Sequence, residues 1–228
     1  MAIEAGTSTY YQAKRGIVQD GLVLHLDAGV KESYSGGTTW RDLSGNGNNG
    51  LLRNGSTFNR SIGGNIDFDG TNDFVRVVHS SSLNDGNSTT ILCWAKSDSA
   101  NWSDYGFLMS KRNRFVLHPQ LNSRSVNCYF NFVGSWLAIN VTPPDITQWV
   151  MYTMSIGGGQ HKAYWNDNIT SVNRSGTLSS STAELRIGYD TGSRYLNGNI
   201  AISMMYNRQL SDSEVFQNFN ATRHRFGL

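Results

Sequence analysis

Oxygen-bearing side chains alternate with glycines in the segment DLSGNGNNG, residues 42–50. Carboxylate and amide oxygens at alternate positions are the ligand pattern of calcium loops, so Asp42 and Asn46 are candidate metal ligands. Arg53 occupies the twelfth position counted from Asp42, where an EF-hand places its bidentate glutamate. The alternative is that these side chains hydrogen-bond their own turns, and the missing glutamate favours it.

A second group of candidate oxygen ligands lies in the segment IDFDGTNDF, residues 66–74. Asp69 and Asp73 are the candidate ligands here, and they could join the first loop in a single Ca²⁺ site. Asp69 also precedes a glycine, which is a turn signal. The alternative is therefore a row of carboxylates on a solvent-facing strand. Calcium is the one cofactor that the sequence raises.

Three aromatic residues are candidates for binding carbohydrate. Trp102 and Tyr105 lie in the polar loop SDSANWSDYG, and Trp136 follows a Gly-Ser turn. Sugar sites stack an aromatic ring on the apolar face of a pyranose, while amides and carboxylates bind the hydroxyls. We predict that these three rings are exposed; the alternative is that each covers a sheet edge.

The residues offer no catalytic constellation. Glycoside hydrolysis needs two carboxylates that flank the sugar bond, and the four glutamates include no E-x-D-x-x-E arrangement; they are Glu4, Glu32, Glu184 and Glu214. The chain has no G-x-S-x-G elbow, H-E-x-x-H pair or Walker loop, and its five histidines are scattered. We predict that the protein is not an enzyme.

The elements that would position these residues are short strands. The run GLVLHLD, from Gly21, alternates apolar side chains with period two, so Leu22, Leu24 and Leu26 share one face. Similar runs recur between Asn-Gly and Gly-Ser turn dipeptides, which is typical of antiparallel hairpins. We predict an all-β sandwich of two antiparallel sheets.

One segment, near residues 211–222, is predicted to be helical. Ser211 and Glu214 have the spacing of an S-x-x-E capping box, and Leu210 can pack on Val215 as a hydrophobic staple. We expect the apolar side of this helix, which carries Phe219, to face the sandwich.

Composition excludes several classes of protein. The 228 residues carry 19 Lys or Arg against 17 Asp or Glu, a net charge of +2, which is too little for nucleic-acid binding. No apolar run approaches the ~20 residues of a membrane span, so we expect no membrane insertion. Cys93 and Cys128 lie in apolar runs without CxxC spacing and are expected to be buried. The N-terminal residues lack the apolar core of a signal peptide, so synthesis in a cytoplasm is expected.

Residues 1–20 are predicted to be an arm, and residues 21–228 one domain. Apolar side chains are sparse in the arm, and its candidate partner-docking residues are Tyr10, Tyr11, Lys14 and Arg15. An extended segment of this kind can add a strand to a neighbouring molecule. The alternative is a disordered leader.

The order of several motifs resembles a known superfamily. The segments GLVLHLDAG, TTWRDLSGNGNNGLL, GGNIDFDGTNDFVRV and LNGNIAISMMYNRQLSDSEVFQNFN look like the laminin G-like branch of the concanavalin A-like lectin/glucanase superfamily. The likeness covers Gly21 to about Phe226. It implies a jelly-roll sandwich of two curved antiparallel sheets, with a short helix packed near the end.

Within that superfamily, DAGVKESYSGGTTWRDLSGNGNNG and YNRQLSDSEVFQNFNATRHRFG resemble copies in structural proteins of tailed bacteriophages. The resemblance implies a non-catalytic virion component, such as a capsid decoration, tail or fibre protein, assembled in a host cytoplasm. Its partners would be other virion proteins and, in a homo-oligomer, further copies of the chain. The alternative is a carbohydrate-binding lectin module that recognises host or mucosal glycans, with or without calcium.

Overall fold

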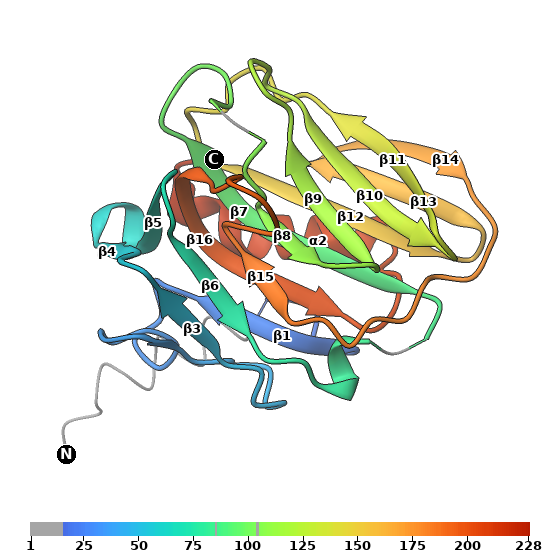
Figure 1. Cartoon of the computed structure of the whole chain (residues 1–228), viewed down its shortest axis with the longest axis horizontal. Helices are drawn as coiled ribbons and strands as arrows, with labels where there is room; N and C mark the ends of the chain where they lie inside the picture. Colours follow the sequence, from blue (N-terminus) through green and yellow to red (C-terminus); the bar gives the residue numbers. More distant parts are fainter. Residues whose placement is uncertain (1–15, 85, 104) are drawn as a thin grey trace.

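The computed structural model describes residues 16–84, 86–103 and 105–228, and these form two antiparallel sheets of eight strands each (Figure 1). Sheet A contains β1 (Leu22–Asp27), β4 (Thr57–Asn59), β5 (Asn65–Asp69), β7 (Thr89–Ser97), β12 (Val150–Gly157), β13 (Gln160–Trp165), β14 (Asn168–Asn173) and β16 (Asn197–Tyr206). Sheet B contains β2 (Thr39–Trp40), β3 (Gly50–Arg53), β6 (Phe74–Val77), β8 (Met109–Lys111), β9 (Phe115–Pro119), β10 (Val126–Phe132), β11 (Ser135–Val141) and β15 (Leu185–Ile187). The predicted all-β jelly-roll sandwich is confirmed.

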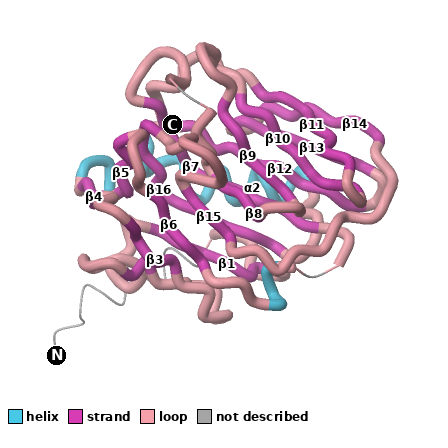
Figure 2. The backbone as a smooth tube through the Cα atoms, viewed as in Figure 1, coloured by secondary structure: helices cyan, strands magenta, loops and turns pink. Residues whose placement is uncertain are grey.

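Local hairpins and long crossings together build the sheets. The strands β8 to β11 follow one another in sheet B, and β12 to β14 follow one another in sheet A. By contrast, β16 lies between β7 and β5, far from all its neighbours in sequence. Strands and their connecting loops make up most of the chain, and helices contribute only short segments (Figure 2). These segments are α2 (Asp212–Thr222) and the 3-10 helices η1 (Ser61–Gly63), η2 (Ser81–Leu83) and η3 (Arg223–Phe226).

The main core lies between the two sheets. Val75 and Val77 on β6, and Phe115 and Leu117 on β9, are fully buried in it. Because side chains alternate along a strand, the residues between them point out of the sandwich. Both cysteines are buried in this core as free thiols, as the sequence predicted.

A second, smaller core lies between α2 and the outer face of sheet A. Trp94 on β7 stacks on Phe226 at 4.2 Å and on Phe219 at 5.8 Å between ring centroids, and its indole nitrogen donates to Thr222 Oγ1 at 2.8 Å. The helix begins at the predicted capping box of Ser211 and Glu214. The helix α2 therefore covers the outer face of sheet A. In Figure 1 the outer side of sheet B faces the viewer, and α2 lies on the far side of the molecule.

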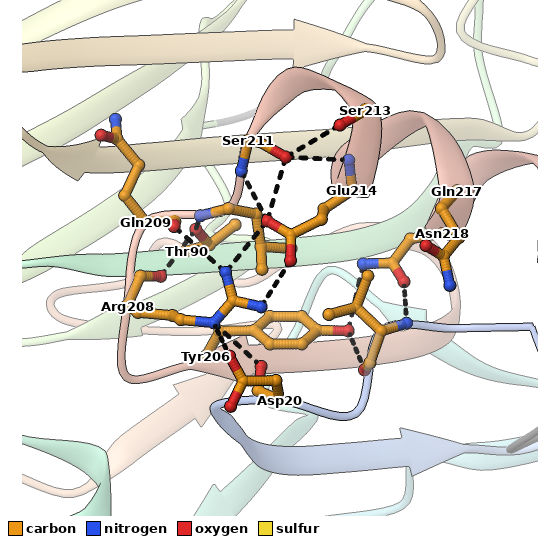
Figure 3. A network of polar contacts seen from close by, with 12 residues as sticks. Asp20, Thr90, Tyr206, Arg208, Gln209, Ser211, Ser213, Glu214, Gln217 and Asn218 are labelled. Atoms are coloured by element: carbon orange, nitrogen blue, oxygen red, sulfur yellow. Dashed lines mark hydrogen bonds and ion pairs between the residues drawn. The ribbon is translucent and has the colours of Figure 1, made fainter.

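Residues 16–20, which the sequence assigned to the arm, pack on the domain. The Val18 amide donates to Asn218 Oδ1 at 2.8 Å, and Tyr206 Oη donates to the Val18 carbonyl at 3.1 Å. Figure 3 shows the polar network around Asn218, Tyr206 and Arg208 that ties this segment to α2. The docking candidates Tyr10, Tyr11, Lys14 and Arg15 lie outside the described residues.

Among the helices of the described residues, none has the length and apolar character to cross a membrane.

Candidate functional site on the open face of sheet B

The outer side of sheet B, which we call the open face, carries aromatic and polar side chains. Strand alternation places Phe74 and Arg76 of β6, Arg186 of β15, and His118 of β9 on this side, because their neighbours in sequence are buried in the main core. Pairing of β6 with β15 sets Arg76 opposite Arg186. The face thus combines flat rings with hydrogen-bond donors, as a carbohydrate site requires.

Three rings form an aromatic cluster at one part of the open face. Tyr189 and Tyr195 stack nearly parallel at 4.3 Å between centroids, with an interplanar angle of 10°. Phe74 lies 5.4 Å from the Tyr189 ring, and the Arg186 guanidinium lies 5.1 Å from the same ring centroid. Gly188 permits this placement, because a Cβ there would lie 2.6 Å from the buried ring of Phe68.

Tyr105 lies beside His118 on the same side of sheet B. The two ring centroids are 5.5 Å apart, and the Arg194 guanidinium lies 5.2 Å from the Tyr105 ring centroid. His118 is also held edge-on by Phe107 at 4.6 Å. Tyr105 is 37% exposed, so its exposure agrees with the sequence prediction; its role in binding stays a prediction.

Trp136 extends the open face toward the edge strand β11. It lies opposite Asn131 of β10, and its ring contacts Tyr129 edge-on at 6.4 Å. Asn127 and Asn140 lie opposite each other on the same two strands and present amide groups. Trp136 is half-buried, so one part of its ring is accessible. At about 4.8 Å per strand, the four spacings from β6 to β10 separate these two strands by about 19 Å.

The expected exposure of Trp102 is wrong. This side chain is 2% exposed and lies in the main core, 6.5 Å from the ring of Tyr152. Its backbone amide donates to the Ser123 carbonyl at 2.9 Å, and its carbonyl accepts from the Asn122 amide at 2.9 Å. Trp102 therefore anchors its loop against the β9 to β10 turn, and it presents no ring to a sugar.

Asp42 organises its own loop. Its Oδ1 accepts from the amides of His25 and Ser44, and its Oδ2 accepts from the Ser44 hydroxyl and the Asn48 amide, all at 2.7 to 2.9 Å. Asn46 donates to the Leu22 carbonyl at 3.2 Å. These contacts are the turn-forming alternative that the sequence left open, and they account for both carboxylate oxygens.

The carboxylates of Asp69 and Asp73 also accept hydrogen bonds from backbone amides. Asp69 Oδ1 accepts from the Thr71 amide at 2.8 Å, and Asp73 Oδ2 accepts from the Asp69 amide at 3.4 Å. Burial and the neighbouring Asp69 charge raise the pKa of Asp73. Within the described part of the chain, no group of three or more His, Cys, Asp or Glu side chains is arranged to hold a metal ion.

Glu184, a carboxylate beside the outward-facing arginines of sheet B, is ion-paired with both of them. Glu184 accepts from Arg76 Nε and from Arg186 Nε, the latter at 2.7 Å. Burial of Glu184 opposes its ionisation, but the two arginines outweigh burial, so its pKa lies below the ordinary value. A general acid in glycoside hydrolysis needs a raised pKa, and this carboxyl has the opposite.

Sequence reasoning missed most of the aromatic cluster. The alternation in DFVRVV could have placed Phe74 and Arg76 outward, because they are out of phase with Val75 and Val77. Tyr189 and Tyr195 lie on a loop and meet through a single β-bridge, for which the sequence carries no periodic signal.

The fold and the open face define a lectin-like β-sandwich domain. Residues 69–216, more than half of the chain, match the family model described as the concanavalin A-like lectin/glucanases superfamily. The chain belongs to this superfamily. A search among curated proteins found no match.

Solved structures share the same fold at low identity. The binding domain of Paraclostridial Mosquitocidal Protein 1 is 18% identical with a TM-score of 0.71, over 89% of this chain and 52% of that one. The binding domain of botulinum neurotoxin DC, solved in complex with SialylT, is 15% identical with a TM-score of 0.70, over 90% and 52%. This chain thus spans about half the length of those toxin domains.

Domain 4 of AbnA, a GH43 extracellular arabinanase from Geobacillus stearothermophilus solved in complex with arabinotriose, is similar over nearly its whole length. It is 19% identical with a TM-score of 0.66, and the alignment covers 86% of this chain and 97% of that domain. At these identities the likeness establishes the fold alone.

Proposed function

We propose that this protein is a non-catalytic carbohydrate-binding module that holds an oligosaccharide along the open face of sheet B. The observation that carries the proposal is the aromatic cluster of Phe74, Tyr189 and Tyr195, with Tyr105 and His118 on the same side of a lectin-like sheet, the side away from α2. Support also comes from the AbnA domain, whose structure contains arabinotriose.

The chemistry of the face suits a neutral sugar chain. Accessible ring surface of Tyr105 and Trp136 can stack on the apolar face of a sugar unit. The side-chain amides of Asn127 and Asn140 can donate to and accept from sugar hydroxyls.

The arrangement of charge favours binding over hydrolysis. Hydrolysis by the retaining route requires a second carboxyl about 5 Å from the first, with one of them protonated. Glu184 is ionised and held by Arg76 and Arg186. We infer from this that a bound sugar chain would be released intact.

Binding of the purified chain to a panel of linear oligosaccharides, including arabinotriose, tests the proposal. We expect Tyr105→Ala to weaken binding by about tenfold, because one stacked ring contributes on the order of 1 kcal/mol. Ile169→Ala on β14 of sheet A removes an exposed apolar side chain elsewhere and should leave affinity unchanged.

The same panel is run with calcium and with a chelator. We expect equal affinity in both, since the open face binds through rings and amides. Binding that disappears on chelation would contradict the proposed metal-free mode and would direct mutagenesis to Asp42, Asn46, Asp69 and Asp73. Equal loss of affinity in Tyr105→Ala and Ile169→Ala would contradict the location on the open face.

We further propose that the module is carried on a bacteriophage particle as a capsid decoration, tail or fibre component. The support is the likeness of residues 27–50 and 206–227 to segments of tailed-phage structural proteins. Many copies on one particle would convert weak sugar affinity into strong attachment, because each bound copy raises the effective concentration of the next.

A further inference from the structure

A groove of about 460 Å³ lies at the end of the sandwich where β4 stands, away from β10 and β11 of the open face (Figure 1). It separates two loops: residues 28–36 after β1, and residues 58–64, which run from β4 through η1. This volume lies within the roughly 300–1,000 Å³ of small-ligand sites. The groove therefore has room for one sugar unit of an oligosaccharide.

Two aromatic rings form the apolar wall of the groove. Tyr34 and Phe58 come from the two separate loops, and their ring centroids are 5.0 Å apart at an interplanar angle of 43°. Tyr34 Oη donates to the Gly37 carbonyl at 2.7 Å, which fixes the orientation of its ring. Phe58 is half-buried and offers the more accessible ring surface.

The base of the groove is held in place by Arg225 of η3. Its guanidinium ion-pairs with Asp27 at the end of β1, and it donates to the carbonyls of Ile62 and Gly64. Gly29 allows the two loops to approach, because a Cβ there would lie 2.2 Å from the Gly63 carbonyl oxygen. The two walls are thus fixed relative to each other before any ligand binds.

The rim of the groove is positively charged. Lys31 and Arg60 line it from opposite loops, and both are exposed. Among the described residues, neither side chain lies within 4.0 Å of a carboxylate, while the charge of Arg225 is balanced by Asp27. Of the lining residues in the described part of the chain, none is Asp or Glu, and Glu32 lies outside the lining.

We infer that this groove binds an acidic sugar unit, carboxylated or sulfated, as a second site separate from the open face. The anionic group lies between Lys31 and Arg60, and the apolar face of the sugar ring lies on Phe58. Ser35 and the backbone of the glycine-rich loops provide hydrogen bonds for the hydroxyls. A neutral sugar would leave the two cations without a partner, so charge selects the ligand.

Calorimetric titration of the whole chain with matched sugars tests this inference. Methyl glucuronide and methyl glucoside differ only in the carboxylate, and N-acetylglucosamine 6-sulfate and N-acetylglucosamine differ only in the sulfate. We expect each acidic sugar to bind about tenfold more tightly than its neutral match. Raising salt from about 0.05 M to 0.5 M should weaken the acidic sugars only, because ions screen exposed charges.

Variants locate the site. Arg60→Ala and Lys31→Ala should each weaken the acidic sugars by about tenfold, whereas Arg124→Ala, which removes an exposed arginine elsewhere, should not. Ser35→Trp would fill the groove while leaving its charges, and should also abolish binding. Tyr105→Ala on the open face should leave these affinities unchanged, so this inference and the proposed function can fail separately.

Three results would overturn the inference. The first is equal affinity for the acidic and neutral sugars of a pair. The second is binding that survives Arg60→Ala, Lys31→Ala and Ser35→Trp in variants whose thermal unfolding matches that of the parent chain. The third is equally tight binding of inorganic sulfate, which would make the groove a simple anion site.

Discussion

A histidine without solvent contact lies inside the sandwich at His161 of β13. Its ring lies 5.0 Å from that of Phe130 across the core, in an edge-on arrangement. Burial, reinforced by the nearby charge of Arg174, lowers the pKa of His161 to about 4. The imidazole is therefore neutral at physiological pH and acts as a core side chain.

His161 should make the free energy of unfolding of the domain depend on pH between its folded-state pKa of about 4 and its ordinary pKa of 6.5. The unfolded chain binds a proton below its ordinary pKa of 6.5, and the folded chain does so only near 4, so stability falls as pH falls through this window. Between pH 7 and pH 5 the free energy of unfolding should fall by about 2 kcal/mol. Urea unfolding at the two pH values should show this loss in the parent chain.

The variant His161→Leu should lose most of that pH dependence, because it leaves no imidazole to protonate. His224→Leu, which removes an exposed imidazole on η3, is the matched control and should behave as the parent chain does. Equal pH dependence in the parent chain and His161→Leu would contradict the assignment.

At the scale of elements, the start of α2 joins three parts of the chain (Figure 3). Glu214 accepts from the Ser211 amide at 2.8 Å and completes the capping box. Arg208, just after β16, forms two bonds to the same carboxylate at 2.6 and 2.9 Å, and it also pairs with Asp20 at 2.8 Å. The helix that covers sheet A is thus connected to both the last strand and the N-terminal segment.

This connection should be sensitive to acid. The hydrogen bonds from Arg208 are the largest cause that lowers the pKa of Glu214 to about 2. A lowered folded-state pKa stabilises the fold above the ordinary value of 4.5, and this contribution disappears as pH falls to about 2. We expect Glu214→Gln to destabilise the domain by about 1 kcal/mol at pH 7, in the range of lost helix caps, with a difference that shrinks toward pH 2.

Thermal unfolding across this pH range measures the effect. Asp167→Asn, in the exposed turn between β13 and β14, is the control for removing a carboxylate and should show little change. A stability difference between the parent chain and Glu214→Gln that stays constant from pH 7 to pH 2 would contradict the role given to Arg208.

At the scale of the whole molecule, the outer faces of the two sheets differ in what covers them. The outer face of sheet A is covered by α2 and η3, which bury Trp94 and Trp149. The outer face of sheet B, which carries the aromatic cluster, lies on the side of the molecule away from α2.

The proposed carrier, a bacteriophage particle, can be tested on intact virions from cells that produce this chain. Antibodies raised against the purified domain should label the capsid, tail or fibres in electron micrographs. Labelling should disappear when free domain is added as competitor. Particles that are unlabelled and lack the chain by mass spectrometry would contradict the virion proposal.

The sequence alone predicted the fold class and the helix, because both depend on local signals. Period-two alternation in GLVLHLD and turn dipeptides between runs identified the strands, and Ser211 with Glu214 marked the helix start to the residue. The turn after Trp165 forms with Asn166 at a φ of 51°. Asparagine reaches this left-handed region more easily than most residues.

Candidate site residues were predicted less well, because exposure depends on which segments pack together. Trp102 and Tyr105 lie three residues apart in one polar loop, yet the first is in the core and the second is 37% exposed. The difference arises where the loop contacts residues 122 and 123 of a later turn. Lys111 and Arg114 are both buried, and each donates to carbonyls of loops distant in sequence.

The sequence by itself therefore determined the elements and the superfamily, through patterns that span only a few residues at a time. Tertiary structure alone decided which face of sheet B is open, that Tyr189 stacks on Tyr195, and that Tyr34 meets Phe58 across a groove. The physical reason is that β16 crosses to the middle of sheet A and α2 then closes over that sheet. Only this long-range pairing separates the side chains that form a core from those that can meet a ligand.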